Sequence, residues 1–180
     1  MGGTSNNVLM TVLSMSLKEY LFRYTDDRKT ETVTIAFPFS IRPPLRHVLD
    51  FDFNNQYALL PLRLRLVDDY ETGFKQIKGE MDKVKHSLTP FAMIFMIKCI
   101  MSMPHIIREA VINDYTKRIT FVISNVPGPR KALTIAGCKT HSQGFFVPAL
   151  KTVVGGISIL SHADVVKICI STDQAIMEHP

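Results

Sequence analysis

The sequence predicts an α/β protein in which a mixed β-sheet is covered by helices, giving a two-layer sandwich. Two observations lead to this prediction. Short apolar and β-branched runs have the length and alternation of strands, and longer runs repeat apolar residues at steps of three and four, as helices do. Along the chain, two strands come before two helices, and several strands follow. This order is typical of layered α/β domains.

Length and composition limit the classes of function. A chain of 180 residues suits one domain, 1–180, with enough core to bury about 70% of its unfolded surface. With 46% hydrophobic and 21% charged residues, the composition is that of an ordinary globular protein. The net charge of +5 is spread along the chain without a basic run. It therefore indicates no nucleic-acid partner and, at most, attraction to an anionic membrane or a phosphorylated cofactor.

The cysteines and the N-terminus bear on location. Cys99, Cys138 and Cys169 are far apart and have no CxxC spacing, so we expect neither a disulfide framework nor a metal site, and we expect a reducing compartment. The first residues lack a basic region followed by an apolar one, which excludes a secretory signal. We therefore expect an intracellular protein, either cytoplasmic or peripherally associated with a membrane.

The first half of the chain predicts a helix and two strands. Thr4 or Ser5 can cap a helix over residues 6–24, whose apolar stripe is broad enough to be buried on more than one side. Residues 33–39 and 57–67 alternate as strands, joined by an irregular connection. Arg63 and Arg65 fall on one face of the second strand, where a solvated face is favoured over a phosphate clamp.

Two helical segments follow. Asp68 and Glu71 resemble a capping box before a helix that Pro90 ends. Residues 91–107 are the most apolar segment, but Lys98 and Pro104 interrupt a membrane span. A core helix under the sheet is favoured here. The alternative is a surface that contacts acyl chains or a bilayer through flexible methionines, namely Met93, Met96, Met101 and Met103.

The last third predicts three strands and a stiff loop. Residues 119–123 form a strand that we expect to end at Ser124 and Asn125, because both residues favour turns. Val126-Pro127-Gly128-Pro129 then forms a rigid loop suited to positioning a ligand. Strands over 152–161 and 165–171 pair around a turn, and Gly155-Gly156 indicates a bulge or a close backbone approach.

One stretch carries a family resemblance. The run Ser124, Asn125, Val126, Pro127, Gly128 and Pro129, followed by Leu133 and by Ala136-Gly137, resembles the SNVPGP…L…AG segment of the C-terminal domain of the wax ester synthase/diacylglycerol acyltransferase family. The likeness extends in order from Thr4 to Asp173. It implies a chloramphenicol acetyltransferase-like fold and one C-terminal acyltransferase domain, with further sequence expected at both ends.

The resemblance also implies a function and a site. The family transfers acyl groups from acyl-CoA, a co-substrate rather than a bound cofactor, to a fatty alcohol or diacylglycerol, for wax ester or triacylglycerol synthesis. The implied site for CoA and substrate is the SNVPGP run with Asn6 and Asn7. Where this chain has Asn6 and Asn7, members of the family carry an Asn-Asp pair. Any role that needs a carboxylate at position 7 is therefore in doubt for this chain. Endoplasmic reticulum, plasma membrane or lipid droplets are the membranes implied.

The catalytic motif of that family is absent. Its general base is the second histidine of HHxxxDG in the N-terminal half, and no two of the six histidines here are adjacent. We therefore expect no catalytic residue and no acyl transfer without an N-terminal half, supplied in cis or in trans. Two alternatives stay open: a non-catalytic lipid- or membrane-associating module, and an enzyme with another nucleophile, Cys138 or Ser124.

Overall fold

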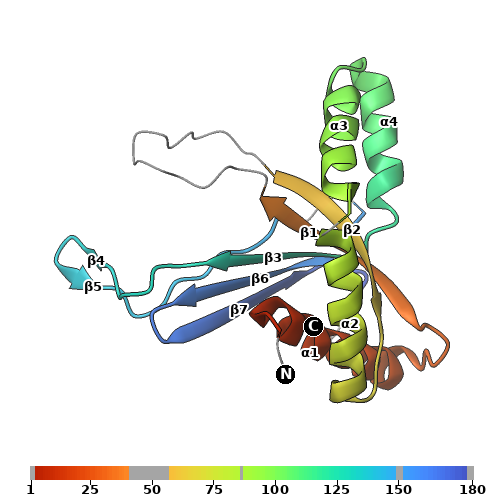
Figure 1. The fold of residues 1–180 in the computed structure, drawn as a ribbon. Helices are drawn as coiled ribbons and strands as arrows, with labels where there is room; N and C mark the ends of the chain where they lie inside the picture. Colours follow the sequence, from red (N-terminus) through yellow and green to blue (C-terminus); the bar gives the residue numbers. More distant parts are fainter. Residues whose placement is uncertain (1–2, 41–56, 86, 149–151, 178–180) are drawn as a thin grey trace.

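A computed structural model describes residues 3–40, 57–85, 87–148 and 152–177. Its main sheet has five strands in the order β2-β1-β3-β6-β7. The strands are β1 (Thr32–Ser40), β2 (Tyr57–Arg65), β3 (Phe121–Pro127), β6 (Gly155–His162) and β7 (Val165–Thr172). The three central strands β1, β3 and β6 are parallel, and β2 and β7 run antiparallel at the two edges. The predicted mixed sheet is confirmed (Figure 1).

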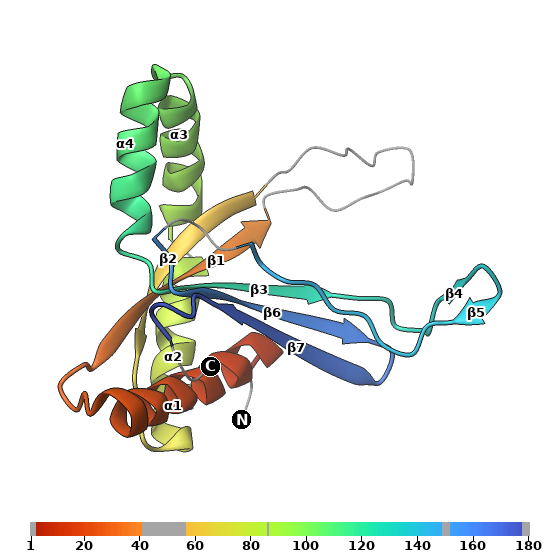
Figure 2. The same cartoon turned by 180° about the vertical axis from the view of Figure 1, so that it is seen from behind.

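Helices α1 (Ser5–Thr25) and α2 (Tyr70–Lys85) cover one face of this sheet, as Figures 1 and 2 show. The main core lies between them and the strands. It contains Met10 and Leu17 of α1, Ile77 and Met81 of α2, and strand residues such as Ile35, Leu64, Phe121, Ile123, Ile157 and Ile159. Because side chains alternate along a strand, Val122 faces the opposite side, where it packs with Ala36, Ile119 and Val153.

The first helix is buried on one stripe only, so the prediction of a broadly buried helix is wrong. Its buried residues are Asn7, Met10, Thr11, Ser14 and Leu17, whereas Val8 and Val12 are 40% and 50% exposed. Polar residues are tolerated in this buried stripe because their side chains form hydrogen bonds. Ser14 Oγ donates to Arg65 O at 2.5 Å and accepts from Val67 N at 3.1 Å. These bonds fasten α1 to the end of β2.

The predicted cap of the second helix is off by one residue. Asp69, not Asp68, accepts a hydrogen bond from the backbone N of Thr72 through Oδ2 at 2.8 Å, and this bond lowers the Asp69 pKa from its ordinary value of 3.8. Asp68 instead forms an ion pair with Lys18 at 2.6 Å. Arg63 and Arg65 are exposed, as predicted.

The apolar segment 91–107 does not form one core helix. It divides into α3 (Thr89–Met101) and α4 (His105–Thr116), because Pro104 adopts φ −52° and ψ 145°, outside the helical region. The two helices project from the sheet (Figure 1). Phe91, Phe95 and Ile106 are 70%, 71% and 82% exposed, so the core interpretation is wrong. Among the described residues, no helix is long and apolar enough to cross a membrane.

Strand β3 continues past the predicted end at Ile123. Ser124 to Pro127 pair in register with Ser158 to Ser161 of β6. The parallel neighbour supplies backbone partners, and this outweighs the turn preference of Ser124 and Asn125. Pro127 is tolerated because it is the last residue of the strand.

The glycine pair of the later strands marks a close approach and not a bulge. β6 begins at Gly155, later than predicted, and pairs with β7 without interruption. A Cβ on Gly155 would lie 2.4 Å from Ser171 O, and one on Gly156 would lie 2.6 Å from Val147 Cβ. A small hairpin, β4 (Thr134–Ile135) and β5 (Cys138–Lys139), extends from the main sheet through Ala136 and Gly137, which have φ 50° and 80°. The predicted connection 40–53 lies almost entirely outside the described residues.

Candidate functional site

Two of the central parallel strands, β1 and β3, separate toward their carboxyl ends. β1 and β3 pair only at Ile35 with Phe121 and at Ala36 with Val122. Beyond Val122, β3 stays with β6 while β1 stays with β2. A pocket of about 500 Å³ lies at this point, lined by Pro38, Ser40, Tyr57, Leu59, Val122, Ser124, Asn125, Val126, Pro127, Phe145, Phe146, Val147 and Pro148. Crevices outside the carboxyl ends of strands are common ligand sites in open α/β sheets.

One wall of the pocket is the segment Phe145 to Pro148, which lies in the connection between β5 and β6. It is held across the sheet face that α1 leaves free. Ser158 Oγ of β6 donates a hydrogen bond to Phe145 O, and Val147 packs over Gly156. No local pattern marks these residues, because their position depends on the absence of a side chain at Gly156.

The predicted site residues divide between the two faces of β3. Ser124 and Val126 lie on the face of Val122, toward the pocket wall, whereas Asn125 lies on the face of Ile123, toward α1. There Asn125 Nδ2 donates a hydrogen bond to Asn6 Oδ1 in the first turn of α1. The helix start and the SNVPGP run are therefore in direct contact, although 119 residues separate them in sequence.

Asn7 is separated from this contact. Its side chain is only 1% exposed, and its Oδ1 accepts a hydrogen bond from Thr4 Oγ1 at 3.2 Å. Asn7 does not line the pocket. In this structure it belongs to the packed start of α1.

The Pro127-Gly128-Pro129 corner is fixed against the β6–β7 hairpin. Gly128 N donates to Ser161 Oγ at 3.2 Å, and Ala163 N donates to Pro129 O at 2.8 Å. A Cβ on Gly128 would lie 1.9 Å from Ser161 O. Glycine is required here by the close approach of two backbones, since its φ lies outside the left-handed region.

The pocket offers hydrogen bonding and apolar contact, but no acid or base. None of the described residues that line it is charged, and none is a histidine or a cysteine. Ser124 therefore has no lining group that could take its proton. Of the described histidines, His162 is 3% exposed, and its Nε2 lies 3.1 Å from Thr140 Oγ1. This contact joins the β6–β7 hairpin to the segment after β5.

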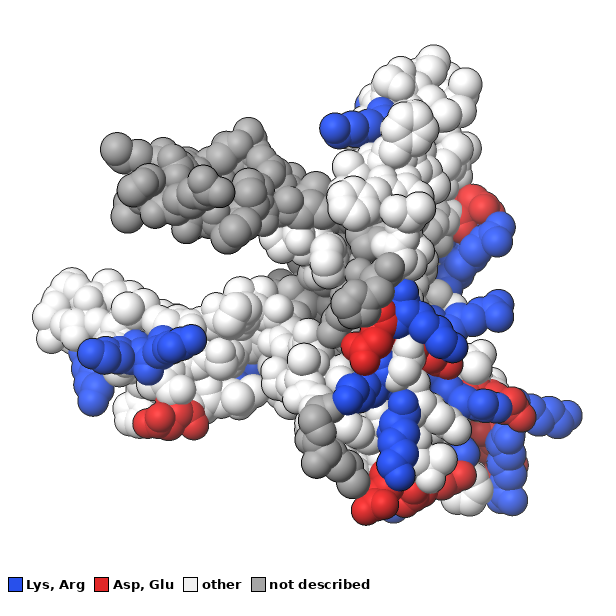
Figure 3. All heavy atoms as spheres, in the orientation of Figure 1, with Lys and Arg blue, Asp and Glu red and all other residues white. Residues whose placement is uncertain are grey.

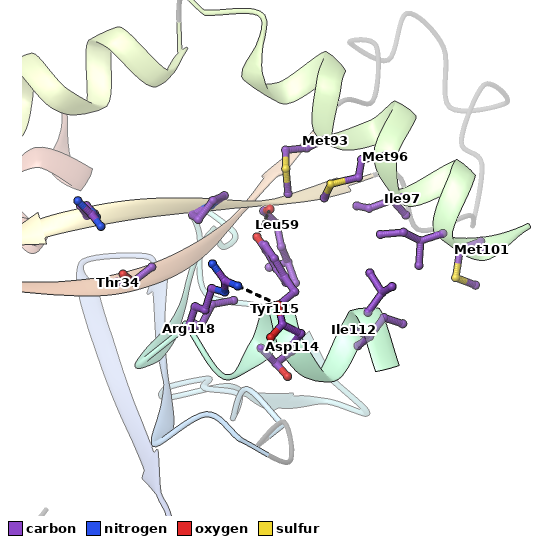
Figure 4. Close-up of a pocket in the computed structure, with 16 residues that line it drawn as sticks. Thr34, Leu59, Met93, Met96, Ile97, Met101, Ile112, Asp114, Tyr115 and Arg118 are labelled. Atoms are coloured by element: carbon purple, nitrogen blue, oxygen red, sulfur yellow. Dashed lines mark hydrogen bonds and ion pairs between the residues drawn. The ribbon is translucent and has the colours of Figure 1, made fainter. Parts of the chain in front are cut away.

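A second, larger cavity lies on the same face of the sheet, between α3, α4 and β2 (Figure 4). Its volume is about 800 Å³. Met93, Met96 and Met101 line it, and Met103 does not. At its base, Tyr115 Oη donates to Leu59 O at 3.3 Å, and burial raises the Tyr115 pKa above 10.0. Leu59 lines both cavities.

Solved structures with the same architecture define the class of fold. The wax ester synthase/diacylglycerol acyltransferase of Marinobacter aquaeolei VT8 superposes with a TM-score of 0.60 at 17% identity, covering 97% of this chain and 39% of that protein. The epimerization domain of tyrocidine synthetase B gives a TM-score of 0.54 at 14% identity, covering 95% and 36%. A starter condensation domain of rhizomide synthetase, in complex with C8-CoA and Leu-SNAC, gives 0.52 at 16% identity, covering 96% and 36%.

These likenesses show the chloramphenicol acetyltransferase-like fold shared by WS/DGAT acyltransferases and condensation domains. Residues 54–180 also match the sequence model of the WS/DGAT C-terminal domain. The chain therefore belongs to the WS/DGAT C-terminal domain family, and it spans about two fifths of the length of the Marinobacter enzyme. No curated protein sequence matches it.

Proposed function

We propose that this chain acts as the C-terminal half of a long-chain O-acyltransferase. Together with an N-terminal half that carries HHxxxDG, it would transfer an acyl group from acyl-CoA to a fatty alcohol or diacylglycerol. The observation that carries the proposal is the pocket between the separated ends of β1 and β3, called here the SNVPGP pocket because Ser124 to Pro127 of the family's SNVPGP run line it. Gly128 and Pro129 do not line it.

The pocket supports a positioning role for this half. Its walls are apolar, with polar groups at Ser124, Ser40 and Tyr57, and pockets of this kind bind an organic group and orient it by a few hydrogen bonds. The Asn6–Asn125 bond and the fixed Gly128 corner hold one side of the pocket rigid. Proton abstraction from the acceptor hydroxyl needs a base within hydrogen-bond reach, so that group would come from the N-terminal half.

The test is complementation in trans. The chain is mixed with a separately produced N-terminal half, palmitoyl-CoA and either hexadecanol or diacylglycerol, and release of CoA thiol is followed. We expect turnover only when both halves are present. Val126→Trp, which narrows the pocket, should lower the turnover of the mixture at least tenfold, whereas Ser16→Ala on the exposed side of α1 should not. A correctly folded mixture that releases no thiol above either half alone would refute the proposal.

A second candidate, a lipid-associating module, is favoured by the outer surface of α3 and α4. Phe91, Phe95 and Ile106 are largely exposed there. Figure 3 shows charged residues gathered over the α1 and α2 region, with few over the projecting helices. Exposed aromatic and aliphatic side chains on a helix pair are suited to the interfacial region of a bilayer.

Liposome flotation tests this candidate. We expect the chain to float with vesicles of phosphatidylcholine containing phosphatidylserine, and the double change Phe91→Ser and Phe95→Ser to abolish flotation. Phe22→Ser, which removes an exposed aromatic side chain from α1, serves as the control. Failure of the unmodified chain to float with both neutral and anionic vesicles would eliminate the candidate.

A further inference from the structure

The cavity between α3, α4 and β2 has apolar walls. The proposed function assigns a role to the SNVPGP pocket but none to this cavity. In Figure 4, Met93, Met96 and Ile97 of α3 and Ile112 of α4 point into the space between the helices. The facing sides of the two projecting helices thus line an apolar volume that is partly open to solvent, since Met96, Ile97 and Ile112 are 37%, 36% and 42% exposed. Their outer faces carry Phe91 and the other exposed side chains described above.

At the base of this cavity Arg118, Asp114 and Tyr115 are paired, while Arg63 of β2 is a further polar lining residue. Arg118 bonds Asp114 at 3.0 Å, and Tyr115 Oη donates to Leu59 O. The body of the cavity, in contrast, is lined by methionines and branched aliphatic residues. A ligand there would find no converging set of hydrogen-bond donors, so the walls fit an unfunctionalised, flexible hydrocarbon.

The cavity adjoins the SNVPGP pocket at Leu59, which lines both. An elongated ligand whose polar end lies near Ser124 would therefore pass Leu59 and reach the space between α3 and α4. Both volumes, about 500 and 800 Å³, are within the usual range for small-molecule sites.

We propose that the α3–α4 cavity holds the methyl-terminal part of the substrate's hydrocarbon chain and so favours long chains over short ones. This inference rests on the proposed function, to which it adds the location of the chain and the residues that select its length. Met96 and Ile112, from the two opposing helices, are the specificity-determining residues.

A first experiment needs no substitution. The chain has nine methionines, so ¹³C-methyl labelling of methionine gives a small set of signals. Titration with palmitate should shift the methyl signals of Met93 and Met96 and leave those of Met10 and Met81, in the main core, unchanged. Octanoate should bind more weakly, because each buried methylene adds up to about fourfold in affinity.

A second experiment fills the cavity. Met96→Trp or Ile112→Trp should weaken palmitate binding at least tenfold and octanoate binding much less, so that the preference for long chains is reduced. Phe91→Trp, on the outer surface, is the matched control and should bind like the unmodified chain. Circular dichroism identifies any variant that fails to fold, and in that case the methionine signals still decide the question.

Two results would overturn the inference. One is palmitate binding by folded Met96→Trp and Ile112→Trp with unchanged affinity. In the other, the methyl signals of Met93 and Met96 do not change with palmitate but shift when the N-terminal half is added. The cavity would then be part of the contact between the two halves. The proposed function is tested separately. Turnover by the mixed halves without methionine shifts would support the acyltransferase function and refute the role of the α3–α4 cavity. Palmitate binding in the cavity without turnover would support the role of the cavity and refute the acyltransferase function.

Discussion

Asn125 of β3 donates a hydrogen bond from its side-chain amide to Oδ1 of Asn6, in the first turn of α1. The bond joins the strand that carries the SNVPGP run to the helix at the beginning of the chain. It therefore fixes the face of β3 opposite to the pocket wall, and it holds Asn125 while Ser124 and Val126 face the other way.

Loss of this bond should destabilise the fold without abolishing it. Asn125→Ala and Asn6→Ala should each lower the free energy of unfolding by about 0.5 to 1.5 kcal/mol, the net value of a typical intramolecular hydrogen bond. Because both changes remove the same bond, the double variant should lose less than the sum of the two single losses. Urea denaturation followed by circular dichroism measures all three, and strictly additive losses would contradict the contact.

Gly128 should not tolerate a side chain. A Cβ there would lie 1.9 Å from the backbone oxygen of Ser161, so Gly128→Ala must push the corner away from the β6–β7 hairpin. We expect a loss of about 1 to 3 kcal/mol in the free energy of unfolding, as for other overpacked sites. Gly79→Ala is the control, because no atom lies within 4 Å of its Cβ position and alanine favours the α2 helix by up to about 1 kcal/mol. Equal thermal stabilities of the two variants would show that the corner is free to move.

The buried hydroxyl of Ser14 should matter far more than its neighbour two residues away. Ser14→Ala leaves Arg65 O and Val67 N without their side-chain partner at the end of β2, which should cost about 1 to 3 kcal/mol of unfolding free energy. Ser16→Ala, on the exposed side of α1, should change little. Guanidinium denaturation curves of the two variants provide the comparison, and overlapping curves would count against the anchoring role.

Tyr115 should make stability depend on alkaline pH. Burial raises its pKa in the folded protein above 10.0, so the unfolded chain releases the phenolic proton first. The contribution is therefore fully present below pH 10.0 and is lost as the pH rises through the folded pKa. Tyr115→Phe should show a shallower fall of unfolding free energy above pH 10.0 than the unmodified chain. Parallel slopes for the two proteins would refute this.

Several elements follow from local sequence. The apolar steps Phe74, Ile77 and Met81 predicted α2, and all three residues are buried, because the period of the pattern equals the period of the helix. Alternation predicted β1 and β2 in the same way. The SNVPGP run predicted the family, and the match over residues 54–180 confirms it. These conclusions depend on residues that are near one another in the chain.

The site was predictable in part. The sequence indicated Ser124 to Pro129 with Asn6 and Asn7. The structure places Ser124 to Pro127 along the pocket and joins Asn125 to Asn6. Nothing in the sequence indicated Phe145 to Pro148 as a pocket wall, or the separation of Asn7 from Asn6. Both follow from packing against residues distant in sequence, namely Gly156 of β6 for the wall and the buried stripe of α1 for Asn7.

By itself, the sequence determined the helix α2, the alternating strands and the family, because periodicity and a six-residue run are local properties. Only the tertiary structure decided that β3 extends through Pro127 and that the apolar segment 91–107 projects as two exposed helices. The physical reason is that backbone pairing and burial depend on which distant strand or helix lies alongside. Ser124 and Asn125 favour turns, but here they pair with β6 and extend the strand. No described helix or strand covers the outer side of Phe91 and Ile106, so both side chains stay exposed.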